Sequence, residues 1–198
     1  MPEEFGFTFR GERVSPDKFR PEYISEFQHV LQTYAPNATT FLEWGSGLTT
    51  QMIAAHAGRI PGAELFLTID AKPDYQRAIF AERERPAFLR EVALDLTGPQ
   101  SMVPELPYST YPLGLNRKFD FIFIDGRRRV ECAFVAMLLC HERTIVAMHD
   151  YRRIRYQPIR ALFGIIEDGP EFRVMRPRDS VASAIAPALS DVQSSMTT

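Results

Sequence analysis

TFLEWGSGLTT, at residues 40–50, is the stretch of this 198-residue chain that decides its fold. It begins with an apolar run typical of a buried strand, and residues 49–57 then follow a helical pattern that Gly58 closes. The glycines between them, Gly45 and Gly47, allow a sharp turn and the close approach of a ligand to the backbone. Free N–H groups at the start of the helix favour an anionic ligand group. A tight turn that binds no ligand is the alternative.

Short apolar runs alternate with helical patterns along the rest of the chain. We expect strands at 40–44, 65–69, 91–96, 119–124 and 144–148, and helices at 16–34, 49–57, 74–84, 127–140 and 157–166. Strands separated by helices of about ten residues are typical of a parallel sheet covered on both faces. The last apolar runs, 172–175 and 181–185, are too close together for a crossover and favour an antiparallel hairpin. The sequence therefore predicts a doubly wound α/β domain that ends in a hairpin.

The composition fits one domain spanning residues 1–198, with 45% hydrophobic and 24% charged residues. Within it we expect residues 1–37 to form a helical extension and residues 190–198 a disordered tail. The first five residues lack the basic and apolar segments of a secretory signal, so we expect a cytoplasmic protein. The longest uncharged apolar run, residues 132–140, is far shorter than the roughly 20 residues of a membrane span. We therefore expect no membrane partner.

Asp70 ends the second predicted strand, where a carboxylate can accept hydrogen bonds from both hydroxyls of a ribose. An acid that caps the next helix without a ligand is the alternative. A dinucleotide-binding fingerprint would require glycine at position 50, and this chain has Thr50, which crowds a pyrophosphate. The pattern favours a nucleoside over a dinucleotide.

Together these features resemble the class I S-adenosylmethionine-dependent methyltransferases over roughly residues 38–187. The matching positions are the Glu43-x-Gly45-x-Gly47 motif, Asp70, Asp95 near the end of the third strand, the strand 119–124 with Asp125 after it, and the terminal hairpin. Thr49 stands where the family often has a third glycine, a departure that members with Gly-Ser-Gly followed by Ser or Thr tolerate. The resemblance implies a seven-stranded sheet in the order 3-2-1-4-5-7-6, with strand 7 antiparallel.

The resemblance also implies a cofactor, S-adenosylmethionine, and residues that bind it. Gly45, Ser46 and Gly47 would pass beneath the cofactor, and Glu43 would meet its methionine ammonium directly or through water. Asp70 would hold the ribose, Asp95 would accept from the adenine amino group, and Asp125 would lie beside them.

Asp125, His149 and Asp150 follow the fourth and fifth predicted strands, so we expect them at the same rim as Gly45 and Asp70. In one hypothesis His149 is a general base oriented by a carboxylate. In another, Asp125 and Asp150 hold Mg²⁺, at positions similar to the metal-binding acids of catechol-type O-methyltransferases. That arrangement usually has a third ligand, and none is obvious beside Asp150. A purely structural role as helix caps is the third possibility.

Arginine is concentrated at the same rim. The chain has a net charge of -2, but residues 125–160 contain eight Arg and four acids. Arg suits bidentate recognition of phosphate or carboxylate, so we expect Arg127, Arg152 and the neighbouring Tyr151 to bind an anionic acceptor. A solvated helix face is the alternative. A nucleic-acid substrate is disfavoured, because the segment lacks the interleaved aromatic residues of a single-strand platform.

The sequence therefore predicts a methyltransferase that uses S-adenosylmethionine to methylate an oxygen of a small molecule. A protein that binds the cofactor without catalysis is the main alternative, and a nucleotide-dependent oxidoreductase is the third. The sequence identifies neither the acceptor nor the oligomeric state.

Overall fold

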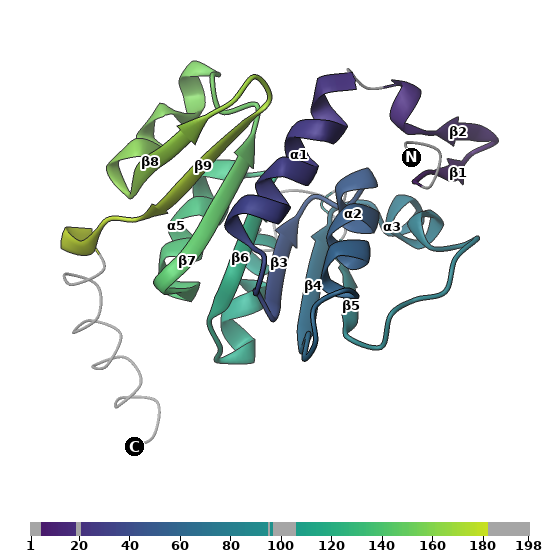
Figure 1. Cartoon of the computed structure of the whole chain (residues 1–198), viewed down its shortest axis with the longest axis horizontal. Coiled ribbons are helices and arrows are strands. Elements are labelled where there is room, and N and C mark those ends of the chain that lie inside the picture. Colours follow the sequence, from purple (N-terminus) through teal and green to yellow (C-terminus); the bar gives the residue numbers. More distant parts are fainter. Residues whose placement is uncertain (1–4, 19–20, 95, 97–105, 182–198) are drawn as a thin grey trace.

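The computed structural model describes residues 5–18, 21–94, 96 and 106–181, and within these ranges a mostly parallel seven-stranded sheet forms the centre of the molecule (Figure 1). Its strands in chain order are β3 (Thr40–Trp44), β4 (Leu65–Asp70), β5 (Leu89–Ala93), β6 (Phe119–Ile124), β7 (Cys140–His149), β8 (Phe163–Asp168) and β9 (Phe172–Pro177). The strands lie in the order β5-β4-β3-β6-β7-β9-β8, and β9 is antiparallel to both of its neighbours. This is the order 3-2-1-4-5-7-6 with strand 7 antiparallel, so the predicted fold is confirmed.

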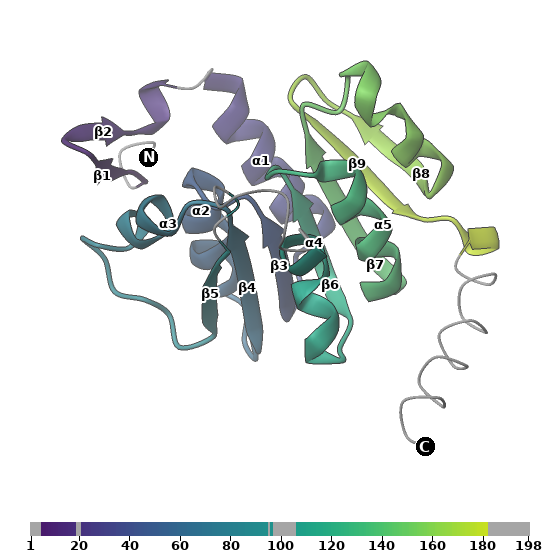
Figure 2. The same cartoon turned by 180° about the vertical axis from the view of Figure 1, so that it is seen from behind.

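Helices cover both faces of the sheet. One face carries α1 (Pro21–Tyr34), α2 (Leu48–Ala57) and α3 (Pro73–Ile79), and the other carries α4 (Leu106–Thr110) and α5 (Arg129–Leu139), as Figures 1 and 2 show. Short 3₁₀ helices are η2 (Pro16–Lys18), η3 (Tyr111–Leu115) and η4 (Ile154–Ala161). Among the helices in the described ranges, none combines the length and apolar character that a bilayer crossing requires.

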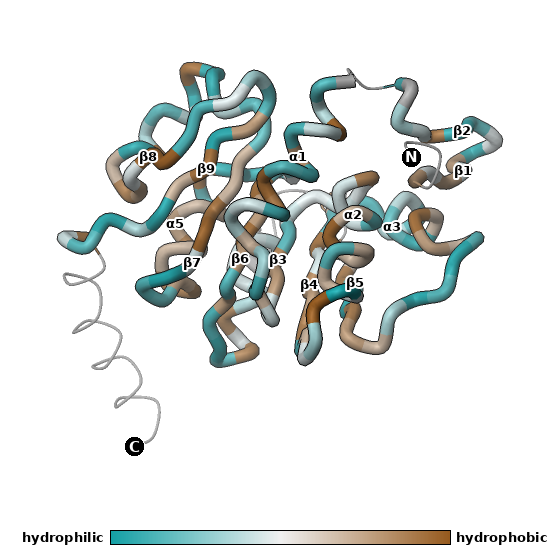
Figure 3. Tube along the Cα trace, viewed as in Figure 1, coloured by the Kyte–Doolittle hydropathy of each residue, from teal (hydrophilic) through white to brown (hydrophobic). Residues whose placement is uncertain are grey.

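Alternate residues of the central strands enter two separate cores. Phe41 and Phe123 pack under α1 and α2, whereas Leu42 and Ile122 pack under α4 and α5. This alternation explains why apolar residues lie on both sides of β3 and β6, whose polar positions are Thr40, Glu43 and Asp120; Figure 3 shows the hydropathy along the chain. With both faces covered, the polar ends of the strands are where a ligand can bind.

The segment before α1 contains a hairpin that the sequence did not predict. β1 (Phe7–Phe9) pairs with β2 (Glu12–Val14), and Phe7 and Phe9 pack on Tyr75 of α3 with ring centroids 5.2 and 5.0 Å away. The Gln51 side chain also pairs with the backbone of Gly6. The extension therefore contains a hairpin packed on α3 as well as a helix; the expected tail at 190–198 lies outside the described residues.

The terminal hairpin is formed by residues 163–168 and 172–177, not by the apolar runs 172–175 and 181–185 from which it was predicted. Residues 157–166 were expected to be a helix, but β8 begins within them at Phe163 and pairs with β9, so 172–175 belongs to the second hairpin strand. Pro158 and Gly164 disfavour a continuous helix there, and the apolar face of β8 is buried through Phe163. Of the strand expected at 181–185, Val181 is helical and residues 182–185 lie outside the described residues.

The connection between β5 and β6 is partly helical. Its described part forms α4 and η3, and the rest of it, residues 97–105, lies outside the described ranges. Trp44 anchors α4, because its Nε1 donates to the Tyr108 carbonyl oxygen at 3.1 Å. This contact places Tyr108 beneath the ends of β3 and β6.

Candidate functional site

The turn after β3 is held against the end of β6. Gly45 has a φ of +99°, and a Cβ there would overlap the backbone of Asp125 and Gly126. Gly126 in turn has no room for a Cβ, because the Tyr108 hydroxyl occupies that place. Gly45 and Gly126 are thus required by contacts within the chain itself.

Gly47 differs from Gly45 and Gly126, because its backbone is extended and no neighbouring group within the described residues occupies the place of a Cβ. A Cβ at Gly47 would meet no atom within 4 Å, and its N–H donates to Thr50 Oγ1 at 2.7 Å. The residue precedes α2, whose first-turn N–H groups begin there. The described part of the chain therefore leaves free space above Gly47.

Asp70 is fixed in place at the end of β4. Its Oδ2 accepts from the Ser46 backbone N–H at 2.9 Å and its Oδ1 from the Lys72 backbone N–H at 2.6 Å. The residue is 9% exposed, and burial raises the pKa of its carboxyl despite these two hydrogen bonds. Asp70 therefore joins the glycine turn to the second strand and keeps lone pairs for a ligand.

Glu43 lies behind the turn. Its carboxyl is completely buried and accepts hydrogen bonds from the hydroxyls of Thr49, Thr50 and Thr68 at 2.7, 2.7 and 2.8 Å. Burial raises the pKa of Glu43 to about 8, against the lowering effect of the three hydroxyls. The role of Glu43 toward a methionine ammonium stays a prediction, and the structure shows a buried carboxyl that holds the turn together.

A cavity of about 670 Å³ opens at the carboxyl ends of β3, β4 and β6. Its walls come from the segments that follow β3, β4 and β6, from the start of α5, and from residues in or next to α3, α4 and η4. The lining residues are Gly45, Ser46, Asp70, Ala71, Lys72, Tyr75, Tyr108, Asp125, Gly126, Arg127, Arg128, Arg129, Val130, Glu131, Arg153, Arg155 and Tyr156. The volume lies in the range of small-molecule and cofactor sites.

Several of the predicted site residues meet at this cavity. Those that line it are Gly45, Ser46, Asp70, Asp125 and Arg127. Those that do not are Glu43, Gly47, His149, Asp150, Tyr151 and Arg152. Asp95 lies outside the described residues.

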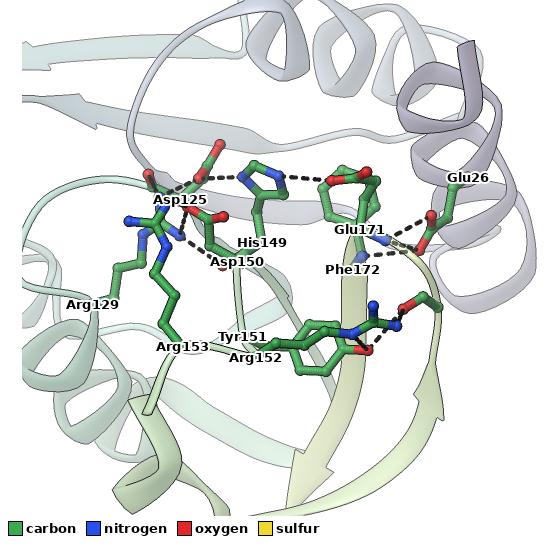
Figure 4. A network of polar contacts seen from close by, with 11 residues as sticks. Glu26, Asp125, Arg129, His149, Asp150, Tyr151, Arg152, Arg153, Glu171 and Phe172 are labelled. Carbon is green, nitrogen blue, oxygen red and sulfur yellow. Dashed lines mark hydrogen bonds and ion pairs between the residues drawn. The ribbon is translucent and has the colours of Figure 1, made fainter. Parts of the chain in front are cut away.

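The expected Mg²⁺ site between Asp125 and Asp150 is filled by a side chain of the protein. Arg129 Nη2 donates to Asp125 Oδ1 at 2.6 Å, and its Nη1 donates to Asp150 Oδ2 at 3.2 Å (Figure 4). Arg153 Nη2 lies 2.6 Å from the same oxygen of Asp150. Among the described residues no group of three metal-ligating side chains exists. The donor set does not fit Mg²⁺, because guanidinium groups already neutralise both carboxylates.

His149 lies between two carboxylates (Figure 4). Its Nδ1 is 2.9 Å from Asp125 Oδ1 and its Nε2 is 3.4 Å from Glu171 Oε2, while the rings of Tyr23 and Phe172 pack against it. Burial lowers the pKa of His149, but the hydrogen bond and charge of Asp125 outweigh burial, so the pKa is raised. The geometry favours a protonated imidazole.

Tyr151 and Arg152 point to the β8–β9 turn instead of the cavity. The Tyr151 hydroxyl donates to the Gly169 carbonyl at 2.8 Å, and Arg152 donates to the same carbonyl and to that hydroxyl (Figure 4). The expectation that these two residues bind an acceptor together with Arg127 stays a prediction; near η4, the arginines that line the cavity are Arg153, just before this helix, and Arg155 within it.

The sequence analysis did not identify Arg129 as the partner of Asp125 and Asp150, and it missed the wall residues Lys72, Tyr75 and Tyr156. Tyr108 also lines the cavity and carried a usable signal, because it lies in the long proline-rich connection before β6. Arg129 carried none that separates it from its two arginine neighbours.

Comparisons with known proteins support the fold. No family model matches the sequence, and no curated protein matches it. A methyltransferase-like protein of Silicibacter pomeroyi is similar in structure, with a TM-score of 0.58 at 18% identity over 81% of this chain and 87% of the other. An O-methyltransferase of Bacillus cereus, solved with S-adenosylhomocysteine, has a TM-score of 0.56 at 18% identity over 83% of this chain and 82% of the other.

An O-methyltransferase of Streptomyces achromogenes involved in tomaymycin synthesis, solved with S-adenosylmethionine, has a TM-score of 0.53 at 14% identity over 82% of this chain and 83% of the other. At such identities the likeness establishes the architecture. The chain has the class I S-adenosylmethionine-dependent methyltransferase fold.

Proposed function

We propose that this protein is a methyltransferase that uses S-adenosylmethionine to methylate an oxygen of a small-molecule acceptor. The observation that carries the proposal is Asp70, whose carboxylate is fixed by the Ser46 and Lys72 amides at the edge of the 670 Å³ cavity. A carboxylate so placed at the end of the second strand binds the two hydroxyls of a ribose.

The residues around Asp70 fit the rest of such a cofactor. The open space above Gly47 admits a ligand against the backbone, and no neighbour within the described chain explains the glycine there. When bound, S-adenosylmethionine supplies an electrophilic methyl group. Asp70 would hold the ribose, Gly45 and Ser46 would lie beneath the ligand, and Glu43 would hold the turn from behind.

Asp125 is the group best placed to take a proton from an acceptor hydroxyl. It lines the cavity, and its Oδ1 is engaged by Arg129 and His149, while its Oδ2 has no hydrogen bond within the described residues. His149 has both ring nitrogens opposite carboxylates and does not line the cavity. We therefore assign proton acceptance to Asp125 Oδ2 and the positioning of Asp125 to His149; holding the acceptor against the methyl group supplies much of the rate.

A protein that binds the cofactor without catalysis is the second candidate, and the engaged ring of His149 favours it, since no unengaged imidazole faces the cavity. Thermal-shift and calorimetric titrations with S-adenosylmethionine, S-adenosylhomocysteine and NAD test the proposal. We expect the two sulfur nucleosides to stabilise the protein. Stabilisation by NAD alone would overturn the proposal, and methyl transfer from radiolabelled cofactor to a pool of small hydroxyl compounds would separate an enzyme from a binding protein.

A further inference from the structure

The cavity wall carries more positive charge than its own acids neutralise. Three of its six basic residues have a carboxylate partner: Arg129 pairs with Asp125 and Asp150, Arg153 with Asp150, and Arg128 with Glu131. Lys72, Arg127 and Arg155 have no ion pair within the described part of the chain. Arg155 lies over the Tyr156 ring at 4.9 Å, and the Lys72 charge acts on Asp70. The unpaired cations leave the wall with a positive excess.

A buried hydroxyl also lies in the same wall. Tyr108 is 1% exposed, and its hydroxyl donates to no acceptor within the described residues, although the Arg127 backbone N–H is close enough to lower its pKa against the effect of burial. It lies against Gly126, next to the start of α5, and burial raises the pKa of Tyr108, so the hydroxyl is a donor. A buried polar group without a partner is costly, and a ligand in the cavity would satisfy it.

The start of α5 faces the same space. Arg128, Arg129 and Val130 line the cavity, and no side chain caps the helix. The first N–H groups of an α-helix lack acceptors within the helix, and the helix dipole favours negative charge there. Arg128 precedes the helix in a left-handed conformation with a φ of 54°, a strained geometry that is typical of functional sites.

We propose that the acceptor carries a phosphate group, which binds at the start of α5 and is held by the Tyr108 hydroxyl, Arg127 and Arg155. The proposal rests on the methyltransferase function proposed above and names the chemical class of its substrate. A phosphate is favoured over a carboxylate because unpaired cations, a neutral hydroxyl donor and free helix amides together match a dianion with several acceptor oxygens. Asp70 and the glycine turn are left for the cofactor.

Binding of inorganic phosphate and pyrophosphate, measured by calorimetry at constant ionic strength with and without S-adenosylhomocysteine, tests the proposal. We expect both anions to bind together with S-adenosylhomocysteine and acetate to bind far more weakly. Tyr108→Phe should weaken phosphate binding about tenfold, as expected for the loss of one hydrogen bond to a charged group. Because the Tyr108 hydroxyl donates to no acceptor within the described residues, its removal should leave the fold intact.

A pair of double variants separates a built site from general attraction to positive charge. Arg127→Gln with Arg155→Gln should weaken pyrophosphate binding at least tenfold and leave the affinity for S-adenosylhomocysteine unchanged. The control, Arg152→Gln with Arg160→Gln, removes the same charge from residues that do not line the cavity and should have little effect. Equal weakening of pyrophosphate binding by both double variants would overturn the proposed phosphate site. Acetate binding as tight as phosphate binding would also overturn it.

The outcomes also separate this inference from the proposed function. If S-adenosylhomocysteine binds and neither phosphate nor pyrophosphate does, the phosphate site is wrong and the methyltransferase proposal stands. If the anions bind and no sulfur nucleoside does, the proposed function is overturned, and with it the assignment of the phosphate to a methyl acceptor.

Discussion

Arg129 Nη2 lies 2.6 Å from Asp125 Oδ1, and this pair joins the start of α5 to the residue that follows β6. The other N–H groups of Arg129 donate to the carbonyl oxygens of Asp125, Gly126 and His149 and to the Asp150 carboxylate. All five donors of the guanidinium are therefore used within the chain. The side chain fixes Asp125 and Asp150 at the place where a divalent cation was one of the sequence-based hypotheses.

The first prediction concerns metal ions. Because Arg129 and Arg153 already neutralise Asp125 and Asp150, we expect EDTA to leave both the melting temperature and the S-adenosylhomocysteine affinity unchanged. Addition of millimolar Mg²⁺ or Mn²⁺ should likewise produce no shift in differential scanning fluorimetry. A saturable rise of several degrees with either ion would show that it binds despite the guanidinium groups.

The second prediction concerns the stability that Arg129 confers. Its side chain is 10% exposed, so Arg129→Gln removes the nearest cation of Asp125 and one of the two cations at Asp150, and it should lower the free energy of unfolding by about 3 kcal/mol. Arg129→Lys should restore little of this, because an ammonium cannot reproduce the planar fork of donors. Urea denaturation measures both, with the exposed Arg160→Gln as a control that we expect to change stability by less than about 0.5 kcal/mol. Equal losses of stability for Arg129→Gln and Arg160→Gln would contradict the proposed role of Arg129 in holding Asp125 and Asp150.

The fold could be predicted from the sequence because burial on two faces dictates the composition of the central strands. β3 and β6 were predicted with the bounds that the structure shows, since every position of Phe41–Trp44 and Phe121–Ile124 is buried. At the edge of the sheet the signal weakens: β8 has exposed positions and follows a 3₁₀ helix that contains Pro158. An exposed edge strand lacks the continuous apolar run that identifies a buried one.

The sequence predicted the parts of the candidate site that depend on where strands end. It did not predict the parts that depend on the residue at which a helix begins. Asp70 and the glycine turn follow from strand ends, which sequence patterns locate well. Which of Arg127, Arg128 and Arg129 pairs with Asp125 and Asp150 depends on where α5 begins, and Arg128 in a left-handed conformation sets that point. Identical neighbours give no sequence signal for this choice.

The third prediction tests the cofactor site through Asp70. Asp70→Ala should weaken S-adenosylhomocysteine binding tenfold or more, because hydrogen bonds to a charged group contribute about 1.5 to 3 kcal/mol. Asp74→Ala is the matched control, since this exposed acid of α3 pairs only with Arg77 among the described residues and does not line the cavity. Isothermal titration calorimetry measures both affinities. An Asp70 variant that binds as tightly as the Asp74 variant would remove Asp70 from the site.

The fourth prediction concerns Glu43 and pH. Burial raises the pKa of Glu43 in the folded protein to about 8 from 4.5, so the unfolded chain releases this proton at a lower pH than the folded one. The contribution of Glu43 to stability is therefore full below pH 4.5 and is lost as the pH rises toward 8. Glu43→Gln keeps the shape without the ionisation, and it should be more stable than the native protein at pH 9 by on the order of 3 kcal/mol.

At pH 4.5 the two proteins should have similar free energies of unfolding, since the native carboxyl is then neutral in the folded state. Urea unfolding from pH 4.5 to 9 measures the difference between them, which cancels every other titrating group. Parallel pH profiles would mean that Glu43 is ionised in the folded state, and its carboxylate would then be available to an ammonium group.

The fifth prediction separates a positioning role of His149 from that of a base. The Asp125 carboxylate raises the pKa of His149, against the lowering effect of burial, so folding favours the protonated ring. The stabilisation is full below the unfolded value of about 6.5 and is lost as the pH rises through the raised pKa. His149→Gln should therefore cost more stability at pH 6 than at pH 9. The S-adenosylhomocysteine affinity of the His149→Gln variant should match that of the native protein, because the His149 ring does not line the cavity. If the loss of stability were instead the same at both pH values, His149 would be neutral in the folded protein, and the assignment of proton acceptance to Asp125 would pass back to the imidazole.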